Sequence, residues 1–347
     1  MALHSCPKRP RLMWGVLATL ATVSVVSFFG SGSHEEFLSH SLPYLLAGGR
    51  RPISAPLLPS SDAFFLLPPL DACSPRAPAL LVLVPSAPGH ALQRQAVRDT
   101  WGGVRWAGKY TVRTFFALGL PPEPSQQAAL EREAAAHRDL IQGRFMDTYA
   151  NLTLKTLALL GWAATRCDGA LFVLKADDDM FVNLPALAQH LQGLARPLPV
   201  YLGRIHWRVH PIRDPRSRHY VPTSLYLDAT FPPYCSGTAY VLSGDAVAPI
   251  LGAARLVPPV PLEDVFVGLC AHRAGIAPQH LGRMSGSSSF PPDPCCYREV
   301  LFSVHGVTPS DMVDMWDRAA PHEKMCGHLQ RALGLLRCKA LARLAGL

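Results

Sequence analysis

Short apolar runs alternate with longer segments of mixed polarity from residue 79 onward. Runs such as 79–85 (ALLVLVP) are continuous, which is typical of strands that are buried on both faces. Alternation of such runs with helical segments predicts an α/β fold with a mostly parallel central sheet and helices on both faces. The expected strands are 79–85, 112–118 and 171–175, and the expected helices are 93–101, 126–137 and 151–162.

The pattern weakens after Pro185 but still predicts further elements. Glu263 and Asp264 open an apolar segment, and acidic groups suit the first turn of a helix. Thr308-Pro-Ser-Asp311 has capping-box spacing with proline at the first helical position, which predicts a helix to about residue 318. Strands are also expected at 200–204 and 238–243, and helices at 245–254 and 329–344. The last helix is expected to pack on the domain, with contact to a membrane surface as the alternative.

The N-terminal region predicts a membrane anchor. Residues 12–30 carry no charge and are long enough to span a bilayer, and Lys8, Arg9 and Arg11 precede them. The positive-inside rule then leaves residues 1–11 in the cytosol and everything after about residue 30 in the lumen. A cleaved signal peptide is the alternative, because small residues at 30–33 (GSGS) would suit cleavage.

Residues 31–77 are rich in proline, serine and glycine and show no sustained helical or strand period. This composition predicts a stem that separates the anchor from a lumenal catalytic domain at 78–347. The apolar patch Phe64-Phe-Leu-Leu67 suggests that part of the stem packs on that domain.

Composition limits the possible partners. The chain is 49% hydrophobic, which is ample for a large core, and its formal charge is +8. A lumenal chain does not meet nucleic acid, so sugar nucleotides, acidic glycans and anionic lipid surfaces are the available anionic partners. The basic segment 204–220 is one candidate for such contact, and a solvated loop is the alternative.

Cysteine usage agrees with an oxidising compartment. Of nine cysteines, Cys6 precedes the apolar stretch, which leaves an even number on the lumenal side. Disulfides are therefore expected, but the sequence cannot choose their pairing. Asn151-Leu-Thr153 is a sequon for N-glycosylation. A zinc site is not expected, because the sequence contains no CxxC pair.

Three adjacent aspartates, Asp177, Asp178 and Asp179, follow the expected strand at 171–175. Ligands of α/β sheets bind beyond the carboxyl ends of the strands, and neighbouring carboxylates repel one another unless a cation holds them. Oxygen ligands suit Mg²⁺ or Mn²⁺, which commonly carry substrate phosphates. A solvated acidic turn is the alternative. An EF-hand is excluded because Val182 and Ala188 occupy the positions of its glycine and its glutamate.

Separated motifs extend this pattern over residues 79–320. They lie at 94–101 (RQAVRDTW), 115–119, 139–156, 175–179 (KADDD), 231–243 and 263–270 (EDVFVGLC). Together they resemble the β1,3-galactosyltransferase and β1,3-N-acetylglucosaminyltransferase family of Golgi type II membrane enzymes. The resemblance implies a GT-A glycosyltransferase fold and an inverting transfer of a sugar from a UDP-sugar. Stretches at 202–211, 260–270, 293–297 and 335–340 are similar to members that add galactose from UDP-galactose to terminal N-acetylgalactosamine of a ganglioside.

The resemblance also implies roles for particular residues. Asp264 is expected to be the catalytic base, with Glu263 as the second candidate. Asp179, Asp177 and His305 are expected to hold Mn²⁺, which accepts mixed nitrogen and oxygen ligands. Taken alone, His305 would more often be an ordinary core or surface histidine.

The remaining expected contacts are to the donor. Arg94 and Arg98 lie one helical turn apart and are expected to reach uridine or phosphate, with a solvated helix face as the alternative. Lys175, Asp177 and Asp178 are expected at the donor as well, although Lys175 would also offset the charge of the carboxylates. Two other functions stay open at this point, an N-acetylglucosaminyltransferase of the same fold and a lumenal glycan-binding protein without turnover.

Overall fold

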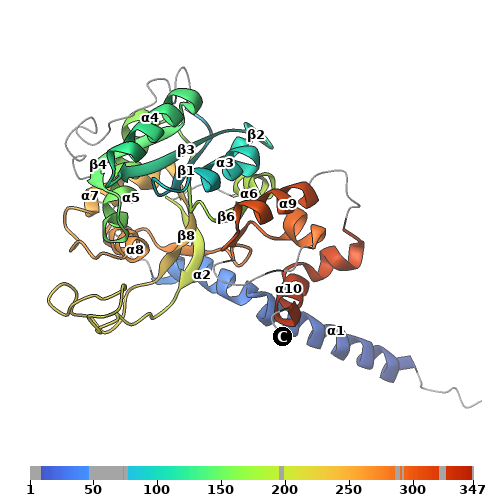
Figure 1. Cartoon of the computed structure of the whole chain (residues 1–347). Coiled ribbons are helices and arrows are strands. Elements are labelled where there is room, and N and C mark those ends of the chain that lie inside the picture. The colour runs from blue at the N-terminus through green and yellow to red at the C-terminus, as the bar shows by residue number, and fades with distance from the viewer. Residues whose placement is uncertain are drawn as a thin grey trace, which may run out of the picture.

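The computed structural model describes residues 9–46, 73, 77–194, 199–285, 290, 293–319 and 326–345. Most of the stem, including the apolar patch at 64–67, lies outside these residues. The α/β class is confirmed. A single large sheet forms the centre of the domain, and helices cover both of its faces (Figure 1).

The sheet has eight strands, in the order β2-β3-β1-β5-β8-β7-β9 with β4 paired to β3. Strands β1, β3, β4 and β5 run parallel, as do β7 and β9, whereas β8 is antiparallel to both of its neighbours. The strands are β1 Leu80–Pro85, β2 Trp106–Ala107, β3 Tyr110–Leu120, β4 Leu140–Met146, β5 Phe172–Ala176, β7 Tyr201–His206, β8 Tyr234–Ser243 and β9 Pro278–His280. The expected mostly parallel sheet is confirmed, with an antiparallel strand in its middle.

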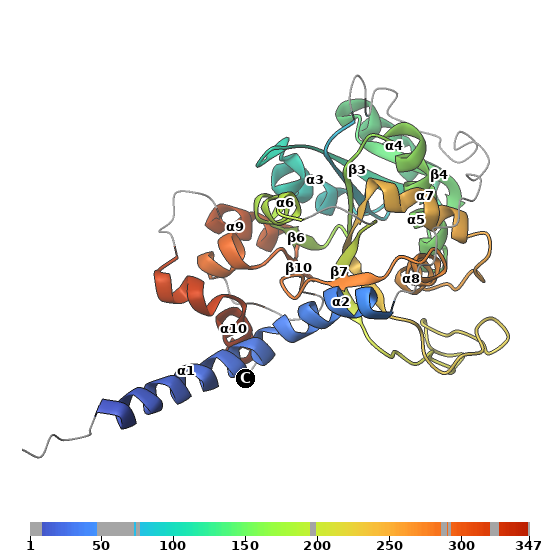
Figure 2. The ribbon, with the colours of Figure 1, turned by 180° about the vertical axis from the view of Figure 1, so that it is seen from behind.

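Alternate residues of each strand enter two separate cores. In β1, Leu80 and Val82 point to one face, whereas Leu81 and Leu83 point to the other. The helices α3 Ala91–Asp99, α4 Pro124–His137, α6 Leu184–Gln192 and α9 Pro309–Ala319 contribute to the first core. The helices α5 Leu152–Arg166, α7 Gly244–Ala253 and α8 Glu263–Arg273 contribute to the second core, and they lie together on the right in Figure 2.

Strand β4 was missed by the sequence analysis because Gln142, Gly143 and Arg144 interrupt its apolar run. Gln142 is nevertheless fully buried, and it exchanges hydrogen bonds with Gln127 and donates to the carbonyl of Gly119. A buried polar side chain with all its partners is compatible with a core position, although the hydrophobic pattern does not reveal it.

The apolar stretch that was expected to span a membrane, residues 12–30, forms most of helix α1. Helix α1 (Arg9–Ser31) contains an apolar span, Met13–Ser31, with a mean hydropathy of 1.7 and no part of it buried in the protein. Helix α2 (Ser33–Leu46) follows after a left-handed Gly32. Helix α2 lies in the segment for which a stem was predicted, and no sustained helical period in the sequence indicated it. Helix α2 is held by its contacts with β9 and the residues just after it. The weak apolar period of α2 does not predict these contacts.

Disulfides are present, as expected, and the fold decides their pairing. Cys73 pairs with Cys167, Cys295 with Cys326, and Cys296 with Cys338. The last two disulfides tie the C-terminal region, including α10 (His328–Ala345), to a short helical turn at Cys296–Val300. Cys235 and Cys270 are buried free thiols, and burial raises the pKa of Cys270 to about 12, so this thiol is inert at neutral pH.

Candidate active site

The acidic triplet begins where the buried strand β5 ends. Strand β5 is covered on both faces, so its backbone delivers the following residues to the edge of the sheet at a fixed position. The amide of Asp177 donates to the carbonyl of Thr238 on β8 at 3.0 Å. The turn is thus fastened to the neighbouring strand before the chain enters the short strand β6 (Met180–Val182).

Asp177, Asp179 and His305 form a group that can hold a metal ion. One ligand atom of each side chain lies within 4.8 Å of those of the other two, and all three residues are partly exposed. His305 Nε2 lies 3.2 Å from Asp179 Oδ2. Burial opposes ionisation of Asp179, but the hydrogen bond and charge of His305 lower the pKa of Asp179 below its ordinary value. The group therefore offers two oxygen donors and one nitrogen donor in one place.

A two-stranded ribbon brings His305 to the aspartates. Strand β10 (Ser303–His305) pairs antiparallel with β6, which sets His305 opposite Met180. The amide of Val307 then donates to the carbonyl of Asp179 at 2.9 Å. This long-range pairing explains why a histidine far along the chain lies beside the triplet.

Helix α8 supplies the next pair of carboxylates at its first turn. Asp264 is half-buried and its Oδ2 accepts from the amide of Gly237 at 3.1 Å. A side chain at position 237 would meet both Glu263 and Asp264 at close range, so glycine there lets β8 approach the start of α8. Asp264 lines the same cavity as Asp177 and His305.

Glu263 points into the protein and has two fixed partners. Tyr240 donates to its Oε1 at 2.8 Å, and Lys175 lies 3.6 Å from its Oε2. Burial raises the pKa of Glu263, an effect that Lys175 opposes. These contacts hold Glu263 in a buried position, whereas Asp264 is partly exposed at the cavity, with its Oδ1 accepting from the amide of Val265 at 2.8 Å.

Lys175 lies between the two carboxylate pairs. Its ammonium is 2.5 Å from Asp177 Oδ1, and it also donates to the carbonyl of Gly237. Burial opposes the charge on Lys175, but Asp177 and Glu263 raise its pKa above the ordinary value, so it remains a cation. Lys175 therefore offsets the negative charge of Asp177 and Glu263.

Asp178 turns away from the group of metal ligands. It accepts from Ser86 Oγ at 2.6 Å and lies 2.9 Å from His90 Nδ1, both in the loop after β1. It is 7% exposed. Asp178 therefore fixes the loop 86–90 against the acidic turn.

Arg94 and Arg98 belong to the same support. Arg94 is fully buried and donates to Glu133, to Ser86 Oγ and to the carbonyls of Ala87 and Pro88. Arg98 bridges Glu133 and Asp139 and lies over the ring of Phe116. The five N–H donors of Arg94 are all engaged in these hydrogen bonds. Contact of Arg94 with uridine or phosphate stays a prediction, and these hydrogen bonds do not favour it.

Several residues of this region escaped the sequence analysis. Lys155 is buried and donates to the carbonyl of Ser86 at 2.7 Å and to Asp147 at 2.9 Å. Asp147 in turn accepts from the amide of Gly119. Lys155 and Asp147 both lie in the motif at 139–156 that resembles the family. Their place in that motif was the one feature of the sequence that pointed to them.

The cavity at the site has a volume of about 410 Å³. Tyr149 and Tyr234 form aromatic walls, and Arg218 and His219 enter from the segment between β7 and β8. His219 Nε2 lies 2.9 Å from the hydroxyl of Tyr149, and Arg218 lies over the Tyr149 ring at 5.3 Å. Cavity walls of this size and character suit a small polar ligand with an apolar face.

The sequon lies close to this cavity. Asn151 precedes α5 and donates to the carbonyl of Met146, whereas Tyr149 and Leu152 on either side line the cavity. Occupancy of Asn151 by a glycan stays a prediction.

The basic segment does not act as one surface. Arg213 donates to the carbonyls of Val221, Tyr226 and Asp228 and so braces its own loop. Arg216 pairs with Asp214 in solvent. Arg218 and His219 face the site cavity, and Arg208 lines a second hollow.

A model of the galactosyltransferase family matches residues 92–282, more than half of the chain and nearly all of the sheet. The chain therefore belongs to the galactosyltransferase family and is a glycosyltransferase of the β1,3 type, acting on a sugar-nucleotide donor and a glycan acceptor.

Among curated relatives, the chain is 42% identical to mouse beta-1,3-galactosyltransferase 4, over 94% of this chain and 96% of that protein. It is 34% identical to human beta-1,3-galactosyltransferase 9, with 91% and 87% covered. Human lactosylceramide 1,3-N-acetyl-beta-D-glucosaminyltransferase matches at 37% over 74% of this chain and 69% of that protein. A mannosyltransferase of known structure, PcManGT from Pyrobaculum calidifontis, matches at 14% identity with a TM-score of 0.34, over 76% of this chain and 66% of that chain.

Proposed function

We propose that this protein transfers galactose from UDP-galactose, with inversion and in β1,3 linkage, to terminal N-acetylgalactosamine of a ganglioside. The observation that carries the proposal is a single cavity lined by Asp177, His305 and Asp264, with Asp179 completing the group of possible metal ligands. The group of possible metal ligands suits a metal-bound diphosphate, and Asp264 suits an acceptor hydroxyl beside a carboxylate base. The similarity to beta-1,3-galactosyltransferase 4, which covers almost the whole chain, supports the choice of sugar and linkage.

The donor atoms fit Mn²⁺. Two carboxylates and one imidazole are ligands that Mn²⁺ accepts, and their spacing permits one ion to touch all three. Such an ion would neutralise negative charge on the diphosphate leaving group. Lys175, which keeps Asp177 at a fixed position from behind, would preserve the ligand geometry when the donor enters.

Asp264 is the proposed base. Its carboxylate would accept the proton of the acceptor hydroxyl while the hydroxyl oxygen bonds to C1 of galactose. The bond between C1 and the diphosphate oxygen breaks, and UDP leaves with its electron pair. Glu263 is the less suitable base because it is buried, with Tyr240 and Lys175 at its oxygens, whereas Asp264 is partly exposed.

The proposed location is the Golgi membrane, with the catalytic domain in the lumen. The apolar part of α1 would be an uncleaved type II anchor, with residues 1–11 as the cytosolic tail, 12–30 as the span and 31–77 as the stem. The three disulfides agree with an oxidising lumen. The location is further supported by the family resemblance.

Transfer of N-acetylglucosamine is the second candidate function, because a lactosylceramide N-acetylglucosaminyltransferase also matches. The test is to incubate the full chain in detergent with UDP-galactose or UDP-N-acetylglucosamine and to measure UDP release with and without a glycolipid ending in N-acetylgalactosamine. The proposal expects acceptor-dependent release from UDP-galactose that a chelator stops and Mn²⁺ restores. Release from UDP-N-acetylglucosamine alone would favour the second candidate. Unchanged turnover in excess chelator would remove the metal from the mechanism.

A further inference from the structure

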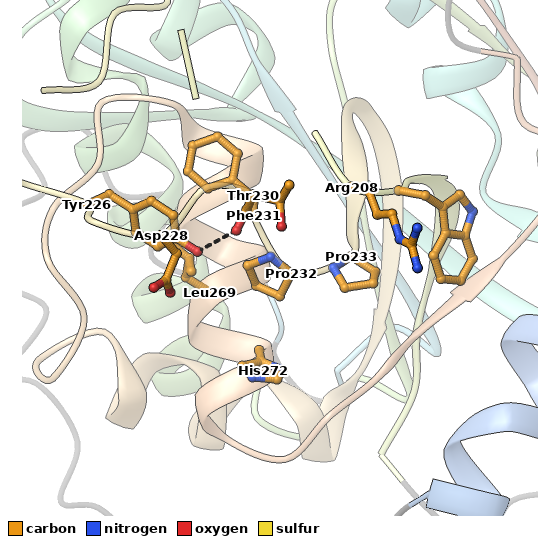
Figure 3. Close-up of a pocket in the computed structure, with 10 residues that line it drawn as sticks. Arg208, Tyr226, Asp228, Thr230, Phe231, Pro232, Pro233, Leu269 and His272 are labelled. Atoms are coloured by element: carbon orange, nitrogen blue, oxygen red, sulfur yellow. Dashed lines mark hydrogen bonds between the residues drawn. The ribbon is translucent and has the colours of Figure 1, made fainter. Parts of the chain in front are cut away.

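A second hollow, of about 640 Å³, lies beside the active-site cavity. It is formed by the segment between β7 and β8 together with the outer side of α8 (Figure 3). Phe231 lines both the hollow and the active-site cavity, so the two are neighbours. The lining residues are Trp207, Arg208, Tyr226, Asp228, Thr230, Phe231, Pro232, Pro233, Leu269 and His272.

The distance between the two cavities suits one branched glycan. Asp264 lies in the first turn of α8, and Leu269 and His272 follow on the same helix. At about 1.5 Å per residue, these positions lie roughly 8 Å and 12 Å along the helix axis from the proposed base. A sugar next to the one that reacts at Asp264 can therefore reach the hollow.

The walls of the hollow suit a sugar ring. Trp207 is 42% exposed, and Pro232 and Pro233 add rigid apolar faces. Tyr226 packs on Phe231 at 4.9 Å between ring centroids and donates through its hydroxyl to the carbonyl of Thr230. This bond, drawn in Figure 3, fixes the aromatic wall. Aromatic and proline faces beside polar groups bind the apolar face of a sugar.

One cation in the hollow lacks a partner. Arg208 is exposed, and within the described part of the chain no hydrogen bond or ion pair engages its guanidinium. No ion pair joins Arg208 to Asp228 among the described residues, and Figure 3 draws the two side chains on either side of Pro232 and Pro233. Arg208 also has a left-handed backbone, with φ of 51°, which is uncommon for a long side chain. Arginine binds carboxylates through two parallel hydrogen bonds.

We infer that this hollow holds a carboxylate-bearing sugar of the acceptor glycan, with Arg208 paired to the carboxylate. The inference rests on the proposed function and deepens it: the acceptor is recognised at its terminal N-acetylgalactosamine beside Asp264 and at a sialic acid in the hollow. Arg208 does not touch the reacting atoms, so it determines acceptor choice and leaves the chemical step alone.

The test compares galactose transfer to a sialylated glycolipid ending in N-acetylgalactosamine and to its asialo counterpart, in one detergent. Arg208→Gln keeps an unbranched polar side chain, removes the charge and shortens the reach toward the carboxylate. This variant should raise KM for the sialylated lipid about five- to tenfold, because a charge-assisted hydrogen bond is partly lost. It should change KM for the asialo lipid less than about twofold. Arg208→Lys should lie between the two. Arg216→Ala, in the same segment but paired with Asp214, is the matched control and should change neither value.

Equal effects of Arg208→Gln on both lipids, or no effect on either, would overturn the inference. If the wild type galactosylates neither lipid, the proposed function fails, and the hollow is then tested by binding. Ligand-detected NMR of the methyl glycoside of N-acetylneuraminic acid should show binding to wild type, weaker binding to Arg208→Gln, and loss of binding when the carboxylate is esterified. Equal binding of acid and ester would overturn the inference by this route.

Discussion

Helix α2 is predicted to be part of the folded catalytic domain, and replacing Ser39 tests this. Ser39 is 2% exposed, and its hydroxyl accepts from the backbone amide of His280 on the edge strand β9 at 2.7 Å. Glu36, one turn earlier, accepts from the amide of Gly282 at 2.6 Å. Glu35 lies 3.0 Å from His280 Nε2. These contacts satisfy amides of β9 and the residues after it, and β9 is the last strand at this edge of the sheet among the described residues.

The expected loss of stability follows from these contacts. Ser39→Ala leaves the buried amide of His280 without its acceptor, which costs about 1–3 kcal/mol. Each kcal/mol lowers the Tm of a domain of this size by about 2–4 °C, so the Tm should fall by roughly 4–8 °C for a loss near 2 kcal/mol. Adding Glu36→Ala removes a charged acceptor as well, and the double variant should lose more than either single variant.

The assay is thermal unfolding of the full chain in detergent, followed by tryptophan fluorescence. Ser125→Ala is the matched control, since Ser125 is an exposed serine in the first turn of α4. Its Tm should stay within about 1 °C of the wild type, as expected for a surface substitution. If Ser39→Ala behaved like Ser125→Ala, α2 would not be docked on β9, and the region after residue 31 would be a spacer as the sequence predicts.

Three further predictions follow from the site and from β9. Asp179→Asn should abolish transfer without lowering secretion or Tm, because a metal ligand loses its charge and keeps its shape; low activity together with a lower Tm would contradict this. Asp264→Asn should slow transfer by about 10²–10⁴-fold and leave UDP-galactose binding near wild type, whereas loss of donor binding would make Asp264 a donor contact. Burial lowers the pKa of His280 to about 4 against the opposing charge of Glu35, below the value of about 6.5 in an unfolded chain. Stability from His280 is therefore full above about pH 6.5 and lost as the pH falls toward 4, so Tm should fall more between about pH 7 and pH 5 in the wild type than in His280→Gln.

The sequence by itself determined the class of the fold and the chemical character of the site. Continuous apolar runs require burial on both faces, so β1, β3 and β5 were predictable from local pattern alone. The position of the acidic triplet after β5, where Asp177 and Asp179 can contribute to holding a metal ion, was predictable because strand ends lie at one edge of a sheet. The capping box at Thr308 correctly placed the start of α9, and the hydroxyl of Thr308 accepts from the amide of Asp311. These features depend on residues that are close in sequence.

The tertiary structure decided everything that depends on distant segments. Strand β10 brings His305 to Asp179, and the start of α8 meets Gly237 of β8. Local pattern could not separate the roles of Glu263 and Asp264, because their difference comes from Tyr240 and Lys175 on other strands.

The same reason explains α2, Asp178 and Arg94. Helix α2 has too weak an apolar period to be recognised alone, and it is stable because an open sheet edge offers amides to its polar side chains. The predicted donor contacts of Asp178 and Arg94 stay predictions, and the fold gives both side chains a partner that the sequence does not reveal, the hydroxyl of Ser86 in the loop after β1. A polar side chain in a buried place takes the partners that the fold supplies, and the sequence does not record which partners those are.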